Sequence, residues 1–278
     1  MFAKVRDLAL EESLLKWDEL CHIAGKFGSL ASLSCGSNQL ATISCSIPAG
    51  LSSTLTILNL EHNKFNSLSD LSMLSSLQAL RHLHLKGNNI STLTSDPSAP
   101  PPTFPESIQY LDLSYNQVPS WTFVDGLRAA FPGLTALRLA HNPVYEGAGI
   151  SDNKLDPTST TTEEAHMITV ARIPGLTALN FATIAGNDRA NAEMFYLSRI
   201  AKALAAVPED AEAEILRDHP RYGDLCAAYG PPDVIRRQET NPEFLESRLI
   251  DVTFRYIGGD GVVVAREKAI PHTFDIYA

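Results

Sequence analysis

The chain has 278 residues, of which 44% are apolar, and its 32 acidic and 22 basic side chains give a net charge of −10. This apolar content is enough for a continuous core, while a mean hydropathy of −0.04 and the lack of a long apolar run argue against a membrane span. The acidic balance disfavours nucleic acid or an anionic membrane surface as the principal partner.

The N-terminal segment and the cysteines favour a reducing, cytoplasmic setting. Acidic residues occur as early as Asp7 and Glu11, and there is no apolar stretch typical of a secretory signal. The four cysteines show no C-x-x-C spacing, and Cys35 occupies an apolar position of a repeated pattern, as a small buried side chain would. Extracellular disulfides are therefore not expected.

An eleven-residue pattern, L-x-x-L-x-L-x-x-N-x-L with apolar substitutions, dominates the first two thirds of the chain. Its copies begin at Val5, Leu30, Leu55, Leu80, Ile108 and Leu134, and a degenerate copy begins at Leu176. The intervals are 25, 25, 25, 28, 26 and 42 residues, and all but the last are typical of leucine-rich repeats. The pattern predicts an α/β fold: a leucine-rich-repeat solenoid with a curved parallel sheet and convex helices or turns.

The repeats also predict which side chains face inward. Each strand is expected at Leu-x-Leu, such as Leu58 to Leu60 or Leu83 to Leu85, with alternate residues buried. Five repeats place an asparagine where the chain leaves the strand: Asn38, Asn63, Asn88, Asn116 and Asn142. Inward amides can satisfy buried backbone groups there, which favours a structural role over ligand binding. The first copy has Ser13 in this position, and the last copy has Ile184.

Between the strands, apolar residues three or four apart predict short convex helices within residues 67–80 and 120–134. The insert Asp96–Ser107 is too rich in proline for a helix, and a polar insert from about Tyr145 to Thr162 predicts a surface loop before a helix at Glu163–Arg172. A further helix is expected after an N-cap at Asn187, and a short one after His219 that ends at Gly230. The apolar face of the former is predicted from Met194, Leu197, Ala201 and Leu204.

The last residues change to a period of two. Residues 250–256 alternate apolar with polar, followed by a glycine-rich turn and a second apolar run, which predicts a partial β-hairpin. Two strands alone are marginally stable, so the hairpin is interpreted as part of an incomplete domain. The predicted organisation is a solenoid over 1–186, a helical C-terminal cap and linker over 187–240, and the incomplete domain over 248–278.

Several segments together resemble tubulin-folding cofactor E. They are SLLKWDELCHIAGKFGSLASL, NQVPSWTFVDGLRAAFPGLTALRLAHNPV, ARIPGLTALNFATI, DRANAEMFYLSRI and HPRYGDLCAAYGPP. The resemblance spans most of the chain and implies a three-part protein with a CAP-Gly domain, this repeat region and a ubiquitin-like domain. By that resemblance, the hairpin from Arg248, with IPHT at Ile270–Thr273, is the opening of the ubiquitin-like part.

The resemblance implies a chaperone that binds alpha-tubulin and other tubulin cofactors and takes part in assembly or dissociation of the tubulin heterodimer. It also implies a cytoplasmic, cytoskeleton-associated protein. No catalytic or nucleotide-binding motif is present, so neither an enzyme nor a cofactor is expected. The alternative is a generic leucine-rich-repeat interaction scaffold, such as a phosphatase or cytoskeletal regulator.

A solenoid binds partners through the non-apolar strand positions of its concave face. The candidate partner-binding residues are Asn59, His82, His84, Tyr110, Asp112, Tyr115, Arg138 and His141. A metal site is conceivable, because His82 and His84 point to the same side of one strand and His62 and His141 follow other strands. Solvated histidines are favoured instead, since no nearby cysteine completes a zinc set, and no metal is expected.

Overall fold

The computed structural model describes residues 4–145, 161–234, 236, 250–258 and 261–269. The chain divides into two compact units, one formed by residues 1–200 with 213–232 and the other by residues 201–212 with 233–278. The larger unit contains the repeats and is described first.

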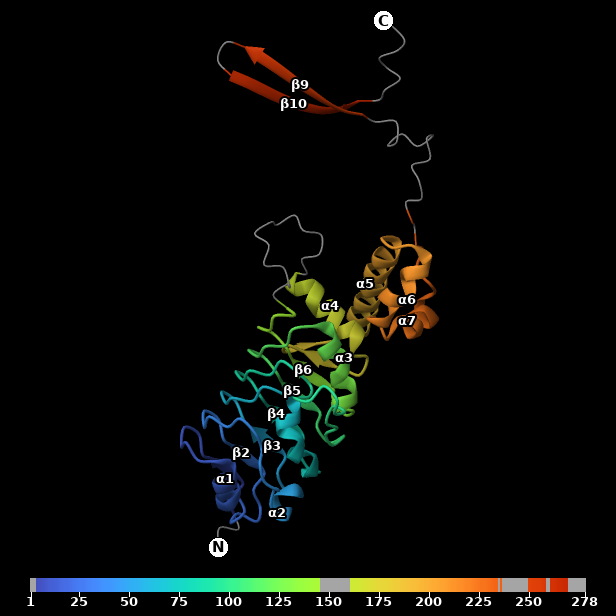
Figure 1. Ribbon diagram of the computed structural model, residues 1–278. Helices are drawn as coiled ribbons and strands as arrows, with labels where there is room; N and C mark the ends of the chain where they lie inside the picture. The colour runs from blue at the N-terminus through green and yellow to red at the C-terminus, as the bar shows by residue number, and fades with distance from the viewer. Residues whose placement is uncertain (1–3, 146–160, 235, 237–249, 259–260, 270–278) are drawn as a thin grey trace, which may run out of the picture. The chain divides into compact units, whose positions relative to one another are not determined.

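Eight short strands of this unit form one sheet, in which the strands follow one another in sequence order (Figure 1). They are β1 (Asp7–Ala9), β2 (Ser32–Ser34), β3 (Ile57–Asn59), β4 (His82–His84), β5 (Tyr110–Asp112), β6 (Ala136–Arg138), β7 (Ala178–Leu179) and β8 (Ala182–Thr183). Strands β1 to β7 are parallel, and β8 returns antiparallel to β7. The predicted leucine-rich-repeat solenoid is confirmed, with an antiparallel closing strand that the repeats did not predict.

The strands lie one residue earlier than predicted. Leu58 and Leu83 are the middle residues of β3 and β4, whereas Leu60 and Leu85 follow the strands. The parallel register pairs Leu58 with Leu83 and Leu83 with Leu111, so these leucines lie at the centres of their strands. The side chains before and after each central leucine therefore point to the opposite side of the sheet.

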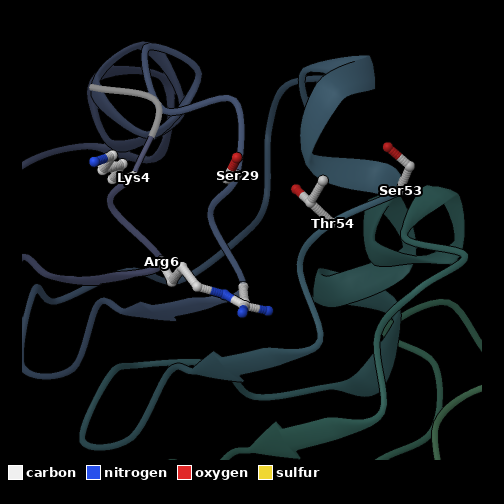
Figure 2. A pocket seen from close by; sticks show the side chains of 6 residues that line it. Lys4, Arg6, Ser29, Ser53 and Thr54 are labelled. Atoms are coloured by element: carbon white, nitrogen blue, oxygen red, sulfur yellow. The ribbon is translucent and has the colours of Figure 1, made fainter. Parts of the chain in front are cut away.

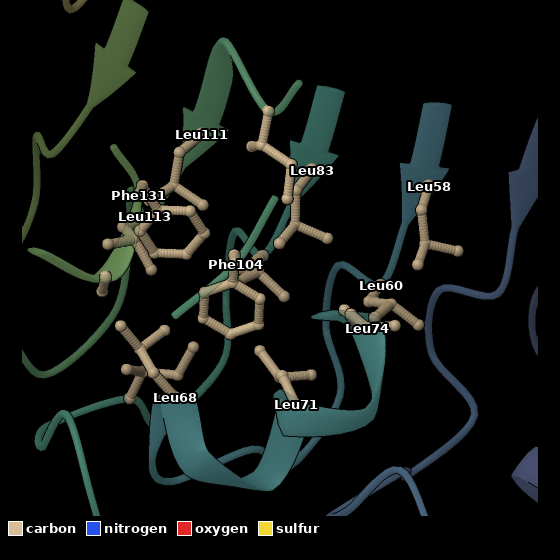
Figure 3. Packing of buried hydrophobic residues seen from close by; sticks show 14 of the residues in the cluster. Leu58, Leu60, Leu68, Leu71, Leu74, Leu83, Phe104, Leu111, Leu113 and Phe131 are labelled. Carbon is tan, nitrogen blue, oxygen red and sulfur yellow. The ribbon is translucent and has the colours of Figure 1, made fainter. Parts of the chain in front are cut away.

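The central leucines bury against the connecting segments (Figure 3). Leu83 and Leu111 are fully buried and face the same core as Leu68 and Leu71 of the 3-10 helix η1 (Leu68–Ser76). Ser67 caps this helix, because its side chain accepts the backbone N–H of Ser69. The other convex elements are α1 (Trp17–Ala24), α2 (Ala49–Ser52) and α3 (Trp121–Ala130). The helices predicted within residues 67–80 and 120–134 are thus confirmed.

The proline-rich insert contributes to the core without forming a helix. Phe104 is buried, and its ring stacks on that of Phe131 with centroids 4.5 Å apart. The backbone N–H of Phe104 donates to the carbonyl of Ala130, which fixes the insert against the end of α3. The second predicted insert falls almost entirely on residues 146–160, outside the described residues.

The five asparagines form the predicted ladder: Asn38, Asn63, Asn88, Asn116 and Asn142 are all buried. Asn63 is representative, since its Oδ1 accepts the backbone N–H groups of Asn38 and Leu40, and its Nδ2 donates to the carbonyls of Cys35 and Leu60. Each asparagine therefore satisfies backbone groups of its own repeat and of the preceding repeat, which explains its periodic position.

The last copy of the pattern closes the ladder with a different residue. Asn180, four positions before Ile184, accepts the backbone N–H groups of Leu139 and Ala140 through Oδ1 at 2.8 and 3.1 Å. The asparagine position had been assigned to Ile184 because the copy was read in the register of the others. The turn between β7 and β8 changes that register and places the Asn180 side chain against the backbone of the preceding repeat.

Helices follow the sheet. They are α4 (Thr162–Arg172), α5 (Gly186–Ala205), α6 (Glu212–Arg217) and α7 (Tyr222–Tyr229). The predicted short helix after His219 is confirmed as α7, with Gly230 at its C-cap at φ 83°, a left-handed conformation that favours glycine. Two details of α5 were wrong. The helix begins at Gly186 rather than after Asn187, and Met194 is 48% exposed. The rest of the predicted apolar face is buried, namely Leu197, Ala201 and Leu204, and the buried stripe also includes Tyr196 and Ile200.

The smaller unit contains a 3-10 helix, η2 (Glu209–Ala211), and the strands β9 (Ile250–Gly258) and β10 (Gly261–Ala269). These strands pair antiparallel, with Ile250 opposite Ala269, so the predicted hairpin is confirmed. The segments 248–249 and 270–278 of the ubiquitin-like interpretation lie outside the described residues. Among the helices that the structure describes, none combines the length and apolar character required to cross a bilayer.

Candidate protein-binding surface

The side of the sheet opposite the buried leucines, termed the open face, carries the candidate binding residues. The strand register places Asn59, His84, Asp112 and Arg138 in one row across β3 to β6. A second row aligns His82 of β4 with Tyr110 of β5. Tyr115 and His141 lie in the turns that follow β5 and β6. The predicted residues therefore lie on neighbouring repeats.

Aromatic contacts organise this face. The Tyr110 ring lies 5.5 Å from His82 and 5.1 Å from His84 between centroids. Tyr115 stacks on His141 at 4.1 Å, and the Lys86 ammonium lies 5.3 Å from the Tyr115 ring. Tyr115 nevertheless remains 49% exposed. Exposed aromatic residues flanked by cations are typical anchors of protein interfaces.

Asp112 differs from the other candidates, because its side chain is completely buried. One of its oxygens, Oδ2, pairs with Arg138 Nη1 at 2.8 Å, and the other accepts the N–H and the hydroxyl of Ser114. Asp112 is thus not an exposed contact residue. Because Arg138 is the cationic partner of this buried carboxylate, we expect its replacement with alanine to lower stability.

His84 is half-buried, and its Nδ1 lies 3.6 Å from Glu61 Oε1. Burial lowers the pKa of His84, while the negative charge of Glu61 opposes this effect. The neutral imidazole is therefore favoured, with a lone pair available on one ring nitrogen.

Phe181 is the exposed residue that sequence reasoning missed. It lies in the two-residue turn between β7 and β8, is 79% exposed, and has the Arg138 guanidinium 3.8 Å from its ring centroid. Both turn residues, Asn180 and Phe181, have positive φ angles of 49° and 71°. Glycine is the preferred residue in such a conformation, so an exposed phenylalanine there points to a function. An exposed aromatic directly after the last short strand was the available signal.

Positive φ angles recur along this edge of the sheet. Tyr115 and His141 have φ angles of 56° and 58°, and His62 occupies the equivalent position of an earlier repeat at 53°. Bulky side chains are uncommon in this region of backbone space. The turns after β5 and β6 therefore present large side chains from two successive repeats at one edge of the open face.

The segment HPRYGDLCAAYG, by contrast, builds the helical cap. His219 Nδ1 lies 2.7 Å from the Tyr196 hydroxyl of α5. Arg221 pairs with Glu193 at 2.9 Å, and Glu193 also accepts the Tyr229 hydroxyl at 2.8 Å. Burial and the adjacent Arg172 lower the pKa of His219 to about 4. This segment carried much of the family resemblance, and its described contacts are structural.

A second candidate is a pocket of about 610 Å³ beside the first repeats (Figure 2). Its lining residues precede β1, β2 and β3 along the chain: Lys4, Arg6, Ser29, Ala31, Ser53 and Thr54. Two cations and three hydroxyl groups can accommodate an anion. All the charged groups are exposed, however, so water competes strongly for them.

The strand order and the buried leucines define a leucine-rich-repeat protein. None of the protein-family models compared with the chain matches it. A solved structure, the Drosophila melanogaster SNF/U2A′ complex, is similar over 67% of this chain and 87% of that chain, with 17% identity and a TM-score of 0.44.

Named relatives give a closer comparison. The chain is 26% identical to tubulin-specific chaperone E of Rattus norvegicus, over 91% of this chain and 47% of that protein. It is 27% identical to tubulin-specific chaperone E of Bos taurus, over 99% of this chain and 51% of that protein. Tubulin-folding cofactor E of Arabidopsis thaliana is 26% identical, over 91% and 46%. These relatives confirm the resemblance to tubulin-folding cofactor E, of whose length the chain spans about half.

Proposed function

We propose that this chain is the repeat region of a tubulin-folding cofactor and binds alpha-tubulin during assembly or dissociation of the tubulin heterodimer. The names of the relatives, which match over nine tenths of the chain, carry this proposal. The function implies a cytoplasmic, cytoskeleton-associated protein that acts by binding rather than by catalysis. It also retains the proposed division into a solenoid at 1–186, a cap at 187–240 and a ubiquitin-like segment at 248–278.

The open face supports partner binding at its edge near the cap. Tyr115 and Phe181 are exposed aromatic residues, and each has a cation beside its ring, Lys86 and Arg138 respectively. The chain carries a net charge of −10, so attraction to a partner depends on such local contacts rather than on total charge. His141 extends this surface by stacking on Tyr115.

The test is a titration of purified tubulin heterodimer with the chain and with the double variant Tyr115→Ala, Phe181→Ala. We expect the double variant to bind at least about tenfold more weakly, because interface aromatic residues commonly contribute more than about 1 kcal/mol each. The matched control is Met73→Ala, which removes a side chain of η1 that is 38% exposed on the convex side.

Two results would contradict the proposal in different ways. If the double variant and the parent bind equally tightly, the open face near the cap is not the interface. If the parent does not bind tubulin, the generic repeat scaffold becomes the better description. Binding lost equally in the Met73 control would indicate a general loss of structure rather than a local contact.

A further inference from the structure

Three potential metal ligands meet on the open face. Glu61, His84 and Asp112 each offer one atom, and these three atoms all lie within 4.8 Å of one another. They come from three successive repeats, with Glu61 two residues after β3, His84 ending β4 and Asp112 ending β5. The sequence favoured solvated histidines because no cysteine accompanies them. In the structure, the carboxylates of Glu61 and Asp112 accompany the His84 imidazole as potential metal ligands.

We propose that Glu61, His84 and Asp112 form a binding site for a divalent transition-metal ion, with Zn²⁺ as the best match. An imidazole nitrogen combined with carboxylate oxygens suits zinc, whereas magnesium and calcium prefer sites made only of oxygen. Three protein ligands leave one coordination position for water, as in other open zinc sites. The proposal is independent of tubulin binding.

Binding of a zinc ion requires the three ligand atoms, which lie within 4.8 Å of one another, to move closer together. Ligand atoms around a tetrahedral zinc ion lie about 3.4 Å apart, given metal–ligand distances of about 2.0–2.2 Å. His84 Nδ1 and Glu61 Oε1 are already 3.6 Å apart. Glu61 has the longest side chain of the three and can complete the contraction by rotating its side-chain bonds.

The backbone positions of all three ligands are fixed. The parallel register pairs His84 with Asp112. Asn59 Oδ1 accepts the backbone N–H of Glu61 at 2.8 Å. Ser114 donates both its N–H and its hydroxyl to Asp112 Oδ1 and leaves Oδ2 pointing to the neighbouring groups. Such supporting hydrogen bonds orient carboxylates in metal sites.

Arg138 is the competing cation. Its Nη1 lies 2.8 Å from Asp112 Oδ2, the oxygen that a metal ion would use. The guanidinium also lies 3.8 Å from the Phe181 ring, which offers a second contact when the carboxylate is taken by the metal. Zinc binding therefore requires Arg138 to give up Asp112 as its partner and to retain only the contact with Phe181. Removal of Arg138 should accordingly increase the affinity for zinc.

The experiment is a calorimetric titration of the reduced full chain with Zn²⁺, repeated with Mg²⁺. We expect one Zn²⁺ per chain and no Mg²⁺ binding under the same conditions. The variants Glu61→Gln and His84→Asn should each weaken zinc binding at least about tenfold, as expected when one of three ligands is lost. His22→Asn, which changes an exposed histidine of α1, should leave binding within about twofold.

Arg138→Gln provides a test in the opposite direction, because it should tighten zinc binding several-fold. Co²⁺ gives a readout that does not depend on variants, since ligation by nitrogen and oxygen lacks the intense thiolate charge-transfer absorption that the cysteines would produce. Zinc binding that persists unchanged in Glu61→Gln and His84→Asn would overturn the site. So would an absence of zinc binding to the parent, a thiolate-type Co²⁺ spectrum or weaker binding in Arg138→Gln.

Discussion

The open face of the sheet and the helical cap use the same residue types in opposite ways. In the cap, Arg172 and Tyr196 are buried in a network with His219. On the open face, Tyr115 and Phe181 are exposed in a left-handed backbone conformation. Arginine, tyrosine and histidine therefore indicate a binding surface only when the fold leaves them accessible.

The comparison also separates resemblance from function. The segment around His219 and Arg221 is a specific part of the family resemblance, and its described contacts hold α4, α5 and α7 together. The resemblance in this segment therefore concerns the architecture of the cap and does not identify partner-binding residues.

The largest expected effect is in the cap. Arg172 pairs with Asp125 and donates to the carbonyl of Asp218, and its guanidinium lies 5.0 Å from the Tyr196 ring. We expect Arg172→Ala to reduce the free energy of unfolding by about 2–3 kcal/mol, because it leaves the half-buried carboxylate of Asp125 unpaired and removes the hydrogen bond to Asp218. Burial already raises the pKa of Asp125, so protonation of Asp125 limits the loss.

Urea denaturation followed by circular dichroism measures this loss. The matched control is Arg128→Ala, which removes an exposed arginine of α3 and should change stability by no more than about 0.5 kcal/mol. Equal midpoints for the two variants would mean that the cap network contributes no more than an ordinary surface residue.

A smaller effect is expected from pH. The pKa of His219 is lowered to about 4 in the folded chain, because of burial and Arg172, while Asp218 opposes the shift. The pKa of this histidine in the unfolded chain is near its ordinary value of 6.5, so the folded chain has its full stability with respect to His219 above that pH. This contribution of His219 to the stability of the folded chain is lost as the pH falls from about 6.5 towards 4. Tyr196 and Arg172 face His219 Nδ1, and both donate to it in the neutral form.

The full change in pKa corresponds to about 3.5 kcal/mol at about 1.4 kcal/mol per pH unit, and partial exposure of His219 reduces this to about 1–2 kcal/mol. Urea denaturation of the parent and of His219→Asn at pH 7.5, 5.5 and 4.5 isolates the contribution, because other titrating groups cancel in the difference. The stability advantage of the parent should shrink with falling pH. A constant difference would show that His219 does not titrate in this window.

The smallest stability effect is expected on the open face. Phe181→Gly relieves a left-handed conformation that costs a non-glycine residue about 1–2 kcal/mol, but glycine also gains entropy in the unfolded chain. The contact with Arg138 is lost as well. We therefore expect a change within about 0.5 kcal/mol by thermal denaturation, together with weaker tubulin binding. A clear loss of stability would instead make Phe181 a structural residue like those of the cap.

Much of the solenoid could be predicted because its determinants are local and periodic. Leucines and asparagines at fixed spacing define the strands and turns, and the proline-rich insert and Gly230 mark interruptions. The pairing of Asp112 with Arg138 could not be predicted, although both were candidate binding residues. The pairing depends on the adjacent positions of the two residues in β5 and β6 and on Ser114, which holds the buried Asp112 carboxylate.

The last repeat shows the limit of a periodic interpretation. Reading Leu176 and the following residues in register assigned Ile184 to the ladder, whereas β8 folds back and Asn180 takes this position. The same change of register turns Phe181 outward. Met194 was predicted to be buried for a related reason. The sequence of one helix allows several apolar stripes, and only the elements that pack against α5 decide which of them is buried.

The asparagine ladder has a direction, and this bears on synthesis of the chain. Asn142 accepts the backbone N–H of Val118, and Asn180 accepts those of Leu139 and Ala140. Each repeat thus obtains acceptors from residues that the ribosome adds later. A nascent solenoid therefore has amides at its growing end that depend on water until the next asparagine emerges, and those of Leu139 and Ala140 depend on Asn180. The turn at Asn180 and Phe181 thereby marks the point at which the growing repeat array can first complete its hydrogen bonding.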